Sequence, residues 1–212
     1  MREQMLEKLR KECISAVTDR YPGEERVVVF GEGRADARIL LVGEAPGEKE
    51  TKCIKPFVGQ AGKNLDDFLH VLEIKREDIY ITNVVKFRPF KVNRKTGRLS
   101  NRPPSRDEIE LCLPYINGEI GIVKPEIVVT LGNTPLQSLT GDRGNLIGKC
   151  HGIPFKNGGY YIFPLYHPAS VIYNRALRET YYDDLAKLKI FIGDSNERFG
   201  WRISNEGELF EV

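Results

Sequence analysis

Residues 38–50 read RILLVGEAPGEKE, an aliphatic run of strand length that ends abruptly in a Gly-Glu-Ala-Pro-Gly turn. Gly43, Pro46 and Gly47 let the backbone turn sharply and approach a planar or anionic ligand without interference from Cβ atoms. The turn lacks the GxGxxG and GKS/T spacings, which disfavours a dinucleotide site and a P-loop. The alternative is a tight connection between a strand and a helix that binds no ligand.

Further segments of buried-strand composition alternate with segments whose apolar residues recur at helical spacing. The strands cover residues 79–85, 126–132 and 160–168, and the helices cover 3–18, 62–72, a segment that begins at the Ser105 capping box, and 175–192. This alternation predicts the α/β class, as a three-layer αβα sandwich around a central four-stranded, mostly parallel sheet. Ligands bind such sheets beyond the carboxyl ends of the strands, so the residues after each strand are candidates for chemistry.

The composition is that of one globular domain. Of the 212 residues, 41% are hydrophobic and 29% are charged, which is enough apolar sequence for one sizeable core. We expect a single domain over residues 1–193 and a C-terminal tail over 194–212. Lys and Arg number 32 against 30 Asp and Glu, so the net charge of +2 argues neither for nor against a nucleic-acid partner.

The chain carries no sign of export. Four cysteines without a CxxC pair, and an N-terminus without an apolar signal core, predict reduced thiols in the cytoplasm. No apolar run approaches the roughly 20 residues of a membrane span, so no membrane association is expected. No motif indicates obligate assembly, and we expect a monomer.

Two residues near the strand ends are suited to hold a nucleic-acid base. Phe57 stands in the loop PFVGQAG (56–62), where its ring could stack on a base or plug the core. Asn83 lies in the strand 79–85, whose other residues are apolar or Thr, and its amide could pair with the polar edge of a flipped base or with structural partners. The sequence leaves both pairs of interpretations open.

Residues 86–106, KFRPFKVNRKTGRLSNRPPSR, carry eight basic residues and no acid. The basic residues are Lys86, Arg88, Lys91, Arg94, Lys95, Arg98, Arg102 and Arg106. Like charges repel one another, and binding to phosphates would relieve the repulsion. The alternative is a solvated loop. This run is the strongest compositional indication of a nucleic-acid partner.

His167 precedes Pro168 at the end of the last expected strand, where its ring would be held as a hydrogen-bond donor. A structural histidine is the alternative. Apolar residues follow on an expected loop tip, residues 169–173. They either fold back into the core or act as a wedge that props open a base stack.

Together these motifs resemble those of the family 4 uracil-DNA glycosylases. The resemblance covers residues 5–193 and rests on five motifs in the order and spacing of that family: GEAPGEKE, PFVGQAG, YITNVVKFRP, SNRPPSRDEIELC and HPAS. It implies the uracil-DNA glycosylase fold and a DNA repair hydrolase that flips uracil into a pocket, cleaves its N-glycosidic bond and leaves an abasic site. Uracil-containing DNA is then the expected partner.

The resemblance also implies which residues bind the substrate. The uracil would lie against the backbone of the first motif, stack on Phe57 and pair with Asn83, which would exclude cytosine. The implied substrate-binding residues are Gly43, Ala45, Pro46, Gly47, Phe57 and Asn83. The expected DNA contacts are Lys86, Arg88, Arg102, Ser170, Val171 and Ile172.

Four residues are implied in catalysis. His167 would donate to uracil O2 as negative charge develops on the departing base. Glu44 and Glu50 correspond to acidic positions near the reacting sugar, and Asn101 would lie by the water or the sugar. Ala45 stands where some relatives have a catalytic Asp, so Glu44 and Glu50 are the candidates to orient the attacking water.

The metal site of the family is incomplete in this sequence. Many members hold an iron-sulfur cluster through four cysteines, but the corresponding residues here are Cys13, Ala16, Phe87 and Cys112. Because such clusters are ordinarily held by four thiolates, we expect no cluster and no metal, with Cys13 and Cys112 as remnants of the ligand set.

Two other functions fit the same motifs. One is a catalytically weak member that binds single-stranded or damaged DNA without cleaving it. The other is a glycosylase for another deaminated base such as hypoxanthine. DNA affinity without base release would identify the first, and competition between free uracil and free hypoxanthine would identify the second.

Overall fold

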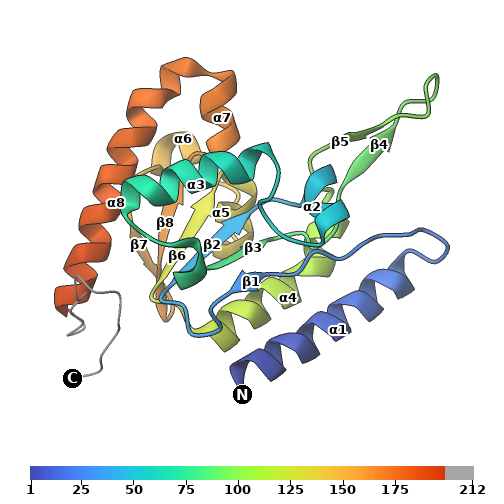
Figure 1. Cartoon of the computed structure of the whole chain (residues 1–212), viewed down its shortest axis with the longest axis horizontal. Helices are drawn as coiled ribbons and strands as arrows, with labels where there is room; N and C mark the ends of the chain where they lie inside the picture. Colours follow the sequence, from blue (N-terminus) through green and yellow to red (C-terminus); the bar gives the residue numbers. More distant parts are fainter. Residues whose placement is uncertain (199–212) are drawn as a thin grey trace.

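The computed structural model describes residues 1–198, apart from the side chains of residues 172, 173 and 194–198. The described part contains a six-stranded sheet with the order β1-β3-β2-β6-β8-β7 (Figure 1). The four central strands run parallel, which confirms the predicted parallel core. The strands are β1 (Glu32–Gly33), β2 (Ile39–Gly43), β3 (Tyr80–Asn83), β6 (Ile127–Leu131), β7 (Phe155–Asn157) and β8 (Tyr160–Leu165).

The predicted count of four strands is wrong, because two short strands extend the described sheet at its edges. β1 pairs antiparallel with β3, and β7 pairs antiparallel with β8. Neither has the apolar run that marks the central strands: both residues of β1 are exposed, and β7 is Phe-Lys-Asn. Short edge strands of this kind offer little unpaired backbone to other chains.

Helices cover both faces of the sheet, so the three predicted layers are present (Figure 1). Leu40 and Val42 share a core with α1 and α4 on one face, whereas Leu41 shares a core with α3 and α8 on the other. This alternation is the period of two that a strand imposes. No helix within residues 1–198 has the length and apolar character needed to span a membrane. The helices are α1 (Arg2–Arg20), α2 (Glu48–Cys53), α3 (Gln60–Leu72), η1 (Arg76–Asp78), α4 (Arg106–Val123), α5 (Asn133–Thr140), α6 (Ile147–Cys150), α7 (Pro168–Tyr173), η2 (Arg175–Leu177) and α8 (Arg178–Arg198).

The predicted helix boundaries are confirmed at α4 and wrong at α8. Ser105 Oγ accepts a hydrogen bond from the Glu108 N–H at 3.3 Å, and the Glu108 carboxylate accepts one from the Ser105 N–H at 2.8 Å, which completes the predicted capping box. The last helix begins at Arg178 and continues past residue 192 to Arg198. Residues 194–198 of the expected tail are therefore helical, and 199–212 lie outside the described residues.

A second, two-stranded sheet forms within the basic run. β4 (Phe90–Val92) and β5 (Leu99–Asn101) pair antiparallel, and their hairpin projects away from the central sheet (Figure 1). No strand was expected between residues 86 and 106. Three-residue strands whose residues are mostly exposed have no core-facing stripe by which the sequence could reveal them.

The order of the strands places a crevice at the carboxyl ends of the parallel strands. β2 and β6 are neighbours in the sheet, but the chain leaves β2 for β3 on one side and leaves β6 for β7 and β8 on the other, so the two connections run towards opposite edges of the sheet. Where two connections diverge in this way, they leave an opening above the strand ends in which ligands bind. The candidate site residues are therefore expected to meet at this edge.

Candidate active site

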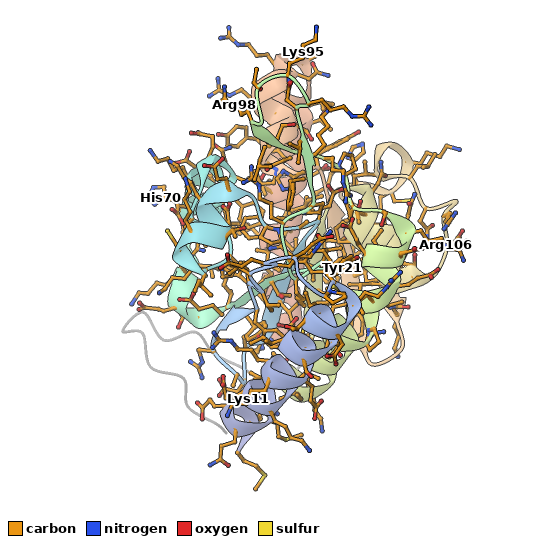
Figure 2. All side chains as sticks on the ribbon, turned by 90° about the vertical axis from the view of Figure 1, so that its right-hand side faces the viewer. Lys11, Tyr21, His70, Lys95, Arg98 and Arg106 are labelled. Atoms are coloured by element: carbon orange, nitrogen blue, oxygen red, sulfur yellow. The ribbon has the colours of Figure 1, made fainter. Side chains whose placement is uncertain are left out.

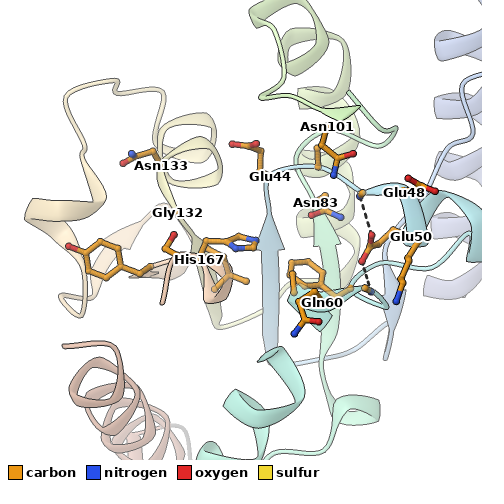
Figure 3. Close-up of a pocket in the computed structure, with 18 of the residues that line it drawn as sticks. Glu44, Glu48, Glu50, Gln60, Asn83, Asn101, Gly132, Asn133 and His167 are labelled. Carbon is orange, nitrogen blue, oxygen red and sulfur yellow. Dashed lines mark hydrogen bonds between the residues drawn. The ribbon is translucent and has the colours of Figure 1, made fainter. Parts of the chain in front are cut away.

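A cavity of about 840 Å³ opens at the carboxyl ends of the parallel strands (Figure 3). Each central strand brings a residue to it: Glu44 follows β2, Asn83 ends β3, Gly132 follows β6 and His167 follows β8. The volume is within the range of pockets that hold small ligands. The predicted site residues that line the cavity are Glu44, Ala45, Gly47, Glu50, Phe57, Asn83, Asn101, His167 and Ser170.

Gly43 and Pro46, which were also predicted to bind the substrate, are buried and are not among the residues that line the cavity. A Cβ atom at Gly43 would overlap Asn83 Oδ1 and the edge of the Phe57 ring. Only glycine therefore allows this amide and this ring to approach the end of β2 together. Phe57 has a φ of 52°, in the left-handed region, which costs a non-glycine residue roughly 1–3 kcal/mol. The surrounding fold holds this strained residue at the cavity.

Phe57 and His167 share one hollow. Both residues line the cavity, their ring centroids are 6.3 Å apart, and their ring planes differ by 24°. Phe57 is only 5% exposed and belongs to the core beneath α3. The two interpretations of this residue are therefore compatible, because one side of the ring packs on the core while the residue also lines the cavity.

Asn83 brings an unpaired amide into the cavity. Its side chain is 3% exposed, yet no other described residue forms a hydrogen bond with the amide group. The amide faces the cavity, so it is available to a ligand that offers both a donor and an acceptor. The main-chain carbonyl of Asn83 accepts a hydrogen bond from Lys86 Nζ at 2.7 Å, which fixes the backbone beneath the amide.

The hydrogen bonds of His167 define the tautomer of its ring. Nδ1 accepts from the Ala169 N–H at 3.1 Å, at the start of α7, so the ring proton lies on Nε2. Burial lowers the pKa of His167 below its ordinary value, because the charged ring loses hydration. At neutral pH the ring is a neutral imidazole with one N–H left for a ligand. Figure 3 shows it reaching into the cavity towards Asn83.

Glu50 holds two loops together. Its carboxylate accepts backbone N–H groups from Gly47 at 3.2 Å, Val58 at 3.2 Å and Gly59 at 2.7 Å (Figure 3). The first of these lies in the glycine turn after β2, and the other two lie in the loop that carries Phe57. Because both carboxylate oxygens are engaged by backbone groups, Glu50 is placed to position the loops around a ligand.

Glu44 is the other carboxylate at the cavity, and it has fewer partners. Its Oε2 accepts a hydrogen bond from Thr134 Oγ1 at 2.5 Å, and its Oε1 has no hydrogen-bond partner among the described residues. This arrangement fixes the side chain and leaves one oxygen for water or substrate. Of the two candidates to orient a water molecule, the geometry favours Glu44.

Asn101 reaches the cavity from β5, at the base of the hairpin. Its Oδ1 accepts a hydrogen bond from Arg88 Nε at 2.7 Å, and the Arg88 guanidinium also contacts the Glu48 carboxylate at 3.3 Å. Because the oxygen of the Asn101 amide is taken, its Nδ2 donor is the group left for another partner.

The three basic residues predicted to contact DNA are engaged by the protein itself. Lys86 is fully buried and forms an ion pair with Glu119, so the prediction that it contacts DNA is wrong. Arg102 binds both oxygens of Glu108, each at 2.7 Å. The Arg88 side chain is 12% exposed. Each of the three pairs with an acidic residue outside residues 86–106. The sequence of the run alone does not reveal these partners.

The predicted wedge is helical. Residues 169–173 belong to α7 instead of a loop tip. Val171 packs against the core that includes α3 and α8, which favours the core interpretation over the wedge for this residue. Ser170 lines the cavity, and the side chain of Ile172 lies outside what the structure describes.

Other residues of the site were expected only by their place, or not at all. Gly132, Asn133 and Tyr166 line the cavity; they stand at the ends of the third and fourth expected strands, where chemistry was expected, but no role was assigned to them. Thr134, which binds Glu44, was not predicted. Gln60 also lines the cavity, at the first turn of α3; it lies within the PFVGQAG motif, but no role was expected for it.

The residues at the family's cluster positions do not fit a four-thiolate cluster. Cys13 and Cys112 are fully buried free thiols, and burial raises the pKa of Cys13 to about 12. Phe87 is fully buried, with its ring edge-on to Tyr21 at a centroid distance of 5.5 Å. Among the described residues, no group of three or more His, Cys, Asp or Glu side chains could hold a metal ion.

Known proteins are similar to this chain over most of its length. The sequence pattern of the uracil DNA glycosylase superfamily matches residues 30–187. A type-4 uracil-DNA glycosylase of Sulfurisphaera tokodaii is 38% identical over 192 residues, 87% of this chain and 83% of the relative. A type-4 uracil-DNA glycosylase of Pyrobaculum aerophilum is 37% identical, over 92% of this chain and 96% of the relative. One of Thermotoga maritima is 40% identical, over 78% of this chain and 83% of the relative. The chain therefore belongs to the type-4 family of the uracil-DNA glycosylase superfamily.

Proposed function

We propose that the protein is a uracil-DNA glycosylase, which hydrolyses the N-glycosidic bond of uracil in DNA and leaves an abasic site. Membership of the type-4 family supports this function. The observation that carries it is the meeting of three groups in one cavity: the unpaired amide of Asn83, the ring of Phe57 and the neutral N–H donor of His167.

Asn83 and Phe57 recognise the base in this proposal. The Asn83 amide donates to uracil O4 and accepts from the uracil N3–H. Cytosine carries an amine and an unprotonated N3 at these positions, so both contacts would be reversed and the amide would remain unpaired. Stacking on Phe57 contributes roughly 1–3 kcal/mol, which offsets part of the few kcal/mol that flipping a base costs.

His167 stabilises the departing base. As the glycosidic bond lengthens, the sugar becomes cationic and negative charge gathers on uracil O2. The Nε2–H of His167 is fixed before the reaction by the bond from Ala169 to Nδ1, so it requires little reorganisation to donate to that oxygen. A neutral donor suits this step, because it stabilises the anion without giving up its proton.

Glu44 acts on the sugar side of the bond. Its Oε1 is available to orient the attacking water and, as a carboxylate, to stabilise positive charge on the sugar. Glu50 positions the loops around the nucleotide, and the Nδ2 donor of Asn101 is available to the water or the sugar. Ala45 supplies no carboxylate, which makes Glu44 the group on which water activation depends.

The direct test is base release from oligonucleotides that contain a single uracil. The wild-type protein is expected to produce alkali-labile abasic sites in them. His167→Ala should lower the rate on the order of 10²-fold, since the main donor to the anion is lost. His70→Ala is the matched control, because His70 is exposed on α3 and its variant should retain full activity. No base release by the wild-type protein beside an active control enzyme would refute the proposal.

The same assay separates the two alternative functions. A protein that binds the oligonucleotides with strong salt dependence but releases no base would be a DNA-binding member without activity. Faster release of hypoxanthine than of uracil would make the deaminated purine the substrate. Asn83→Asp sharpens this comparison, because it alters the amide that reads uracil and should lower the preference for uracil over cytosine.

We also propose that the protein works without an iron-sulfur cluster. The packing around Phe87 supports this proposal. The Arg26 guanidinium lies 3.6 Å from the ring centroid of Tyr21 and 4.9 Å from that of Phe87. Such cation-π contacts stabilise an aromatic cluster without metal. Protein purified without oxygen should be active, colourless and free of iron. A visible absorption band with stoichiometric iron and sulfide would contradict this.

We further propose that the protein is a monomer that acts in the cytoplasm. Its four cysteines, all within the described residues, are free thiols, which suits a reducing compartment. Light scattering during size-exclusion chromatography should give the mass of one chain, 24.1 kDa. A mass twice as large would overturn the monomer.

A further inference from the structure

The β4–β5 hairpin is a formed structure that the chemistry of the cavity does not use. The register Lys91↔Ser100 and Val92↔Leu99 pairs its strands. The turn is closed by hydrogen bonds from the Asn93 N–H to the Arg98 carbonyl at 2.9 Å and from the Gly97 N–H to the Asn93 carbonyl at 2.8 Å. Asn93 Oδ1 also accepts the Lys95 N–H at 2.9 Å, so the turn has a defined conformation.

All the ionised side chains of the hairpin are basic and solvent-exposed. Lys91, Arg94, Lys95 and Arg98 are exposed, and none of these side chains pairs with an acid among the described residues. Figure 2 shows Lys95 and Arg98 at the far end of the hairpin, at the opposite end of the molecule from Lys11. Four like charges on one projecting element repel one another and attract a polyanion.

An apolar pair lies beside these charges. Val92 is 54% exposed and Leu99 is 42% exposed, and the two residues are cross-strand partners. They have little of the protein to pack against, whereas apolar side chains of DNA-binding proteins contact sugars and base edges in the grooves. The hairpin surface therefore combines four cations that can bind phosphates with two apolar side chains that can contact sugars or bases.

The base of the hairpin is attached to the rim of the cavity. Asn101, the last residue of β5, lines the cavity and is bound to Arg88, two residues before β4. Arg102 donates to the Phe90 carbonyl at 3.1 Å and fixes the first pair of the hairpin. A nucleotide in the cavity would thus place its flanking strand beside the hairpin.

We propose that the hairpin, residues 90–101, is a DNA-binding arm that follows the phosphate backbone on one side of the flipped nucleotide. This inference rests on the proposed function for the position of the DNA. The five residue steps from Phe90 to Lys95 span at most about 17 Å, at roughly 3.3 Å per extended residue. One strand of DNA carries a phosphate about every 3.4 Å, so the arm reaches up to about five nucleotides from the cavity.

The test compares two variants of equal charge. The arm variant carries K91Q, R94Q, K95Q and R98Q. The control variant carries K8Q, K11Q, K75Q and K124Q, which removes the same charge from exposed lysines on α1 and at the amino ends of β3 and β6. Both are assayed for DNA affinity across a salt series, on uracil duplexes shortened one base pair at a time from either end.

The arm variant should lower the slope of log affinity against log salt by about 3 to 4, since each phosphate contact contributes about 0.9. Wild-type affinity should fall as the outermost five or so base pairs are removed on one side of the uracil. The affinity of the arm variant should not depend on these base pairs. The control variant should keep the wild-type slope and length dependence. An arm variant with the wild-type slope, or a loss of length dependence that is equal on both sides, would overturn the proposal.

The outcome is independent of the proposed function in one respect. At saturating DNA, the arm variant should release uracil at the wild-type rate, because Asn83, Phe57 and His167 are unchanged. A wild-type protein that bound DNA but released no base would refute the proposed glycosylase activity. The salt slopes would still test whether the hairpin binds DNA. Base release with no effect of the arm variant on binding would refute the arm alone.

Discussion

Lys86 and Lys95 lie nine positions apart in one run of basic residues, and the structure puts them in opposite environments. Lys86 is fully buried beneath the cavity, and Lys95 is exposed near the end of the hairpin (Figure 2). The charge of Lys86 is neutralised by Glu119 within the protein. The comparison shows that one basic run has two environments: its start is buried and bonded to the strand that ends in Asn83, and its middle is exposed, as the proposed DNA-binding arm requires.

The partners of Lys86 explain why its burial is tolerated. Its ammonium group donates to Thr82 Oγ1 and to the Asn83 carbonyl, each at 2.7 Å, and to the Glu119 carboxylate. Glu119 in turn accepts from Tyr80 Oη at 3.0 Å and from Thr82 Oγ1 at 2.9 Å. A buried ion pair is stable only when hydrogen bonds satisfy the remaining donors and lone pairs, as they do here.

Lys86→Met should have the largest effect on stability. It leaves the Glu119 carboxylate buried without a cation, which costs about 3–5 kcal/mol of the free energy of unfolding. Lys95→Met is the matched control and should stay within about 0.5 kcal/mol of wild type, as exposed substitutions do. Urea unfolding of both variants measures the difference. Equal stabilities would show that the two environments are not as different as the contacts indicate.

A double variant sharpens the same comparison. Lys86→Met combined with Glu119→Gln removes both charges and keeps an amide oxygen as acceptor for Tyr80 and the Gly31 N–H. It should recover part of the lost stability, because the penalty of Lys86→Met lies mainly in the unpaired carboxylate. A double variant less stable than Lys86→Met would contradict this account.

The sequence predicts those features whose partners are close in the chain. The apolar runs of the four central strands and the Ser105–Glu108 capping box are local, and both were recognised. The carboxylate that pairs with Lys86 lies 33 positions away on α4, so nothing within residues 86–106 reveals that this lysine is buried. The strands of the hairpin pair with each other and face no core, so their sequence shows no apolar alternation.

The site divides in the same way. His167, Asn83 and Glu44 were found because each stands at or directly after the end of a buried strand, a position that the sequence shows. The role of Glu50 was not evident, because it depends on three backbone N–H groups, two of them in the loop that carries Phe57. The conformation of a loop is set by tertiary contacts and leaves little trace in residue type.

Glu108→Gln should have the next largest effect. Burial of this carboxyl group raises its pKa, but hydrogen bonds from Arg102, the Ser105 N–H and Arg26 outweigh burial and lower the pKa from 4.5 to about 2. The variant should lose about 1–3 kcal/mol at pH 7, as expected when hydrogen bonds to a charged group are weakened. Arg102 would then remain in place near the hairpin without its charged partner.

The pH dependence of that loss has a definite sign. Because the folded-state pKa of Glu108 lies below the unfolded value, its stabilisation is complete above about pH 4.5 and is lost as the pH falls towards 2. Urea unfolding of wild type and Glu108→Gln should therefore converge over this range. Glu110→Gln is the control, since Glu110 is exposed and pairs with exposed Arg106. A difference that does not change with pH would contradict the assignment.

Arg88→Gln tests the boundary between the buried and the exposed parts of the run. The guanidinium holds Asn101 at the cavity and contacts Glu48, and a hydrogen bond of this kind contributes about 0.5–1.5 kcal/mol. If that free energy is expressed in the transition state, base release should slow roughly 2- to 10-fold. Arg106→Gln, in an exposed pair, should leave the rate unchanged. Single-turnover rates at saturating DNA measure both.

Lys95→Gln should have the smallest effect on the protein and a measurable one on binding. The side chain has no partner among the described residues, so the free energy of unfolding should stay within about 0.5 kcal/mol of wild type. One phosphate contact fewer should lower the salt slope by about 0.9. Lys11→Gln, at the other end of the molecule, removes the same charge and should leave the slope unchanged (Figure 2). If the two variants shifted the salt slope equally, DNA affinity would depend only on the net charge of the protein. The middle of the basic run would then have no specific role in DNA binding.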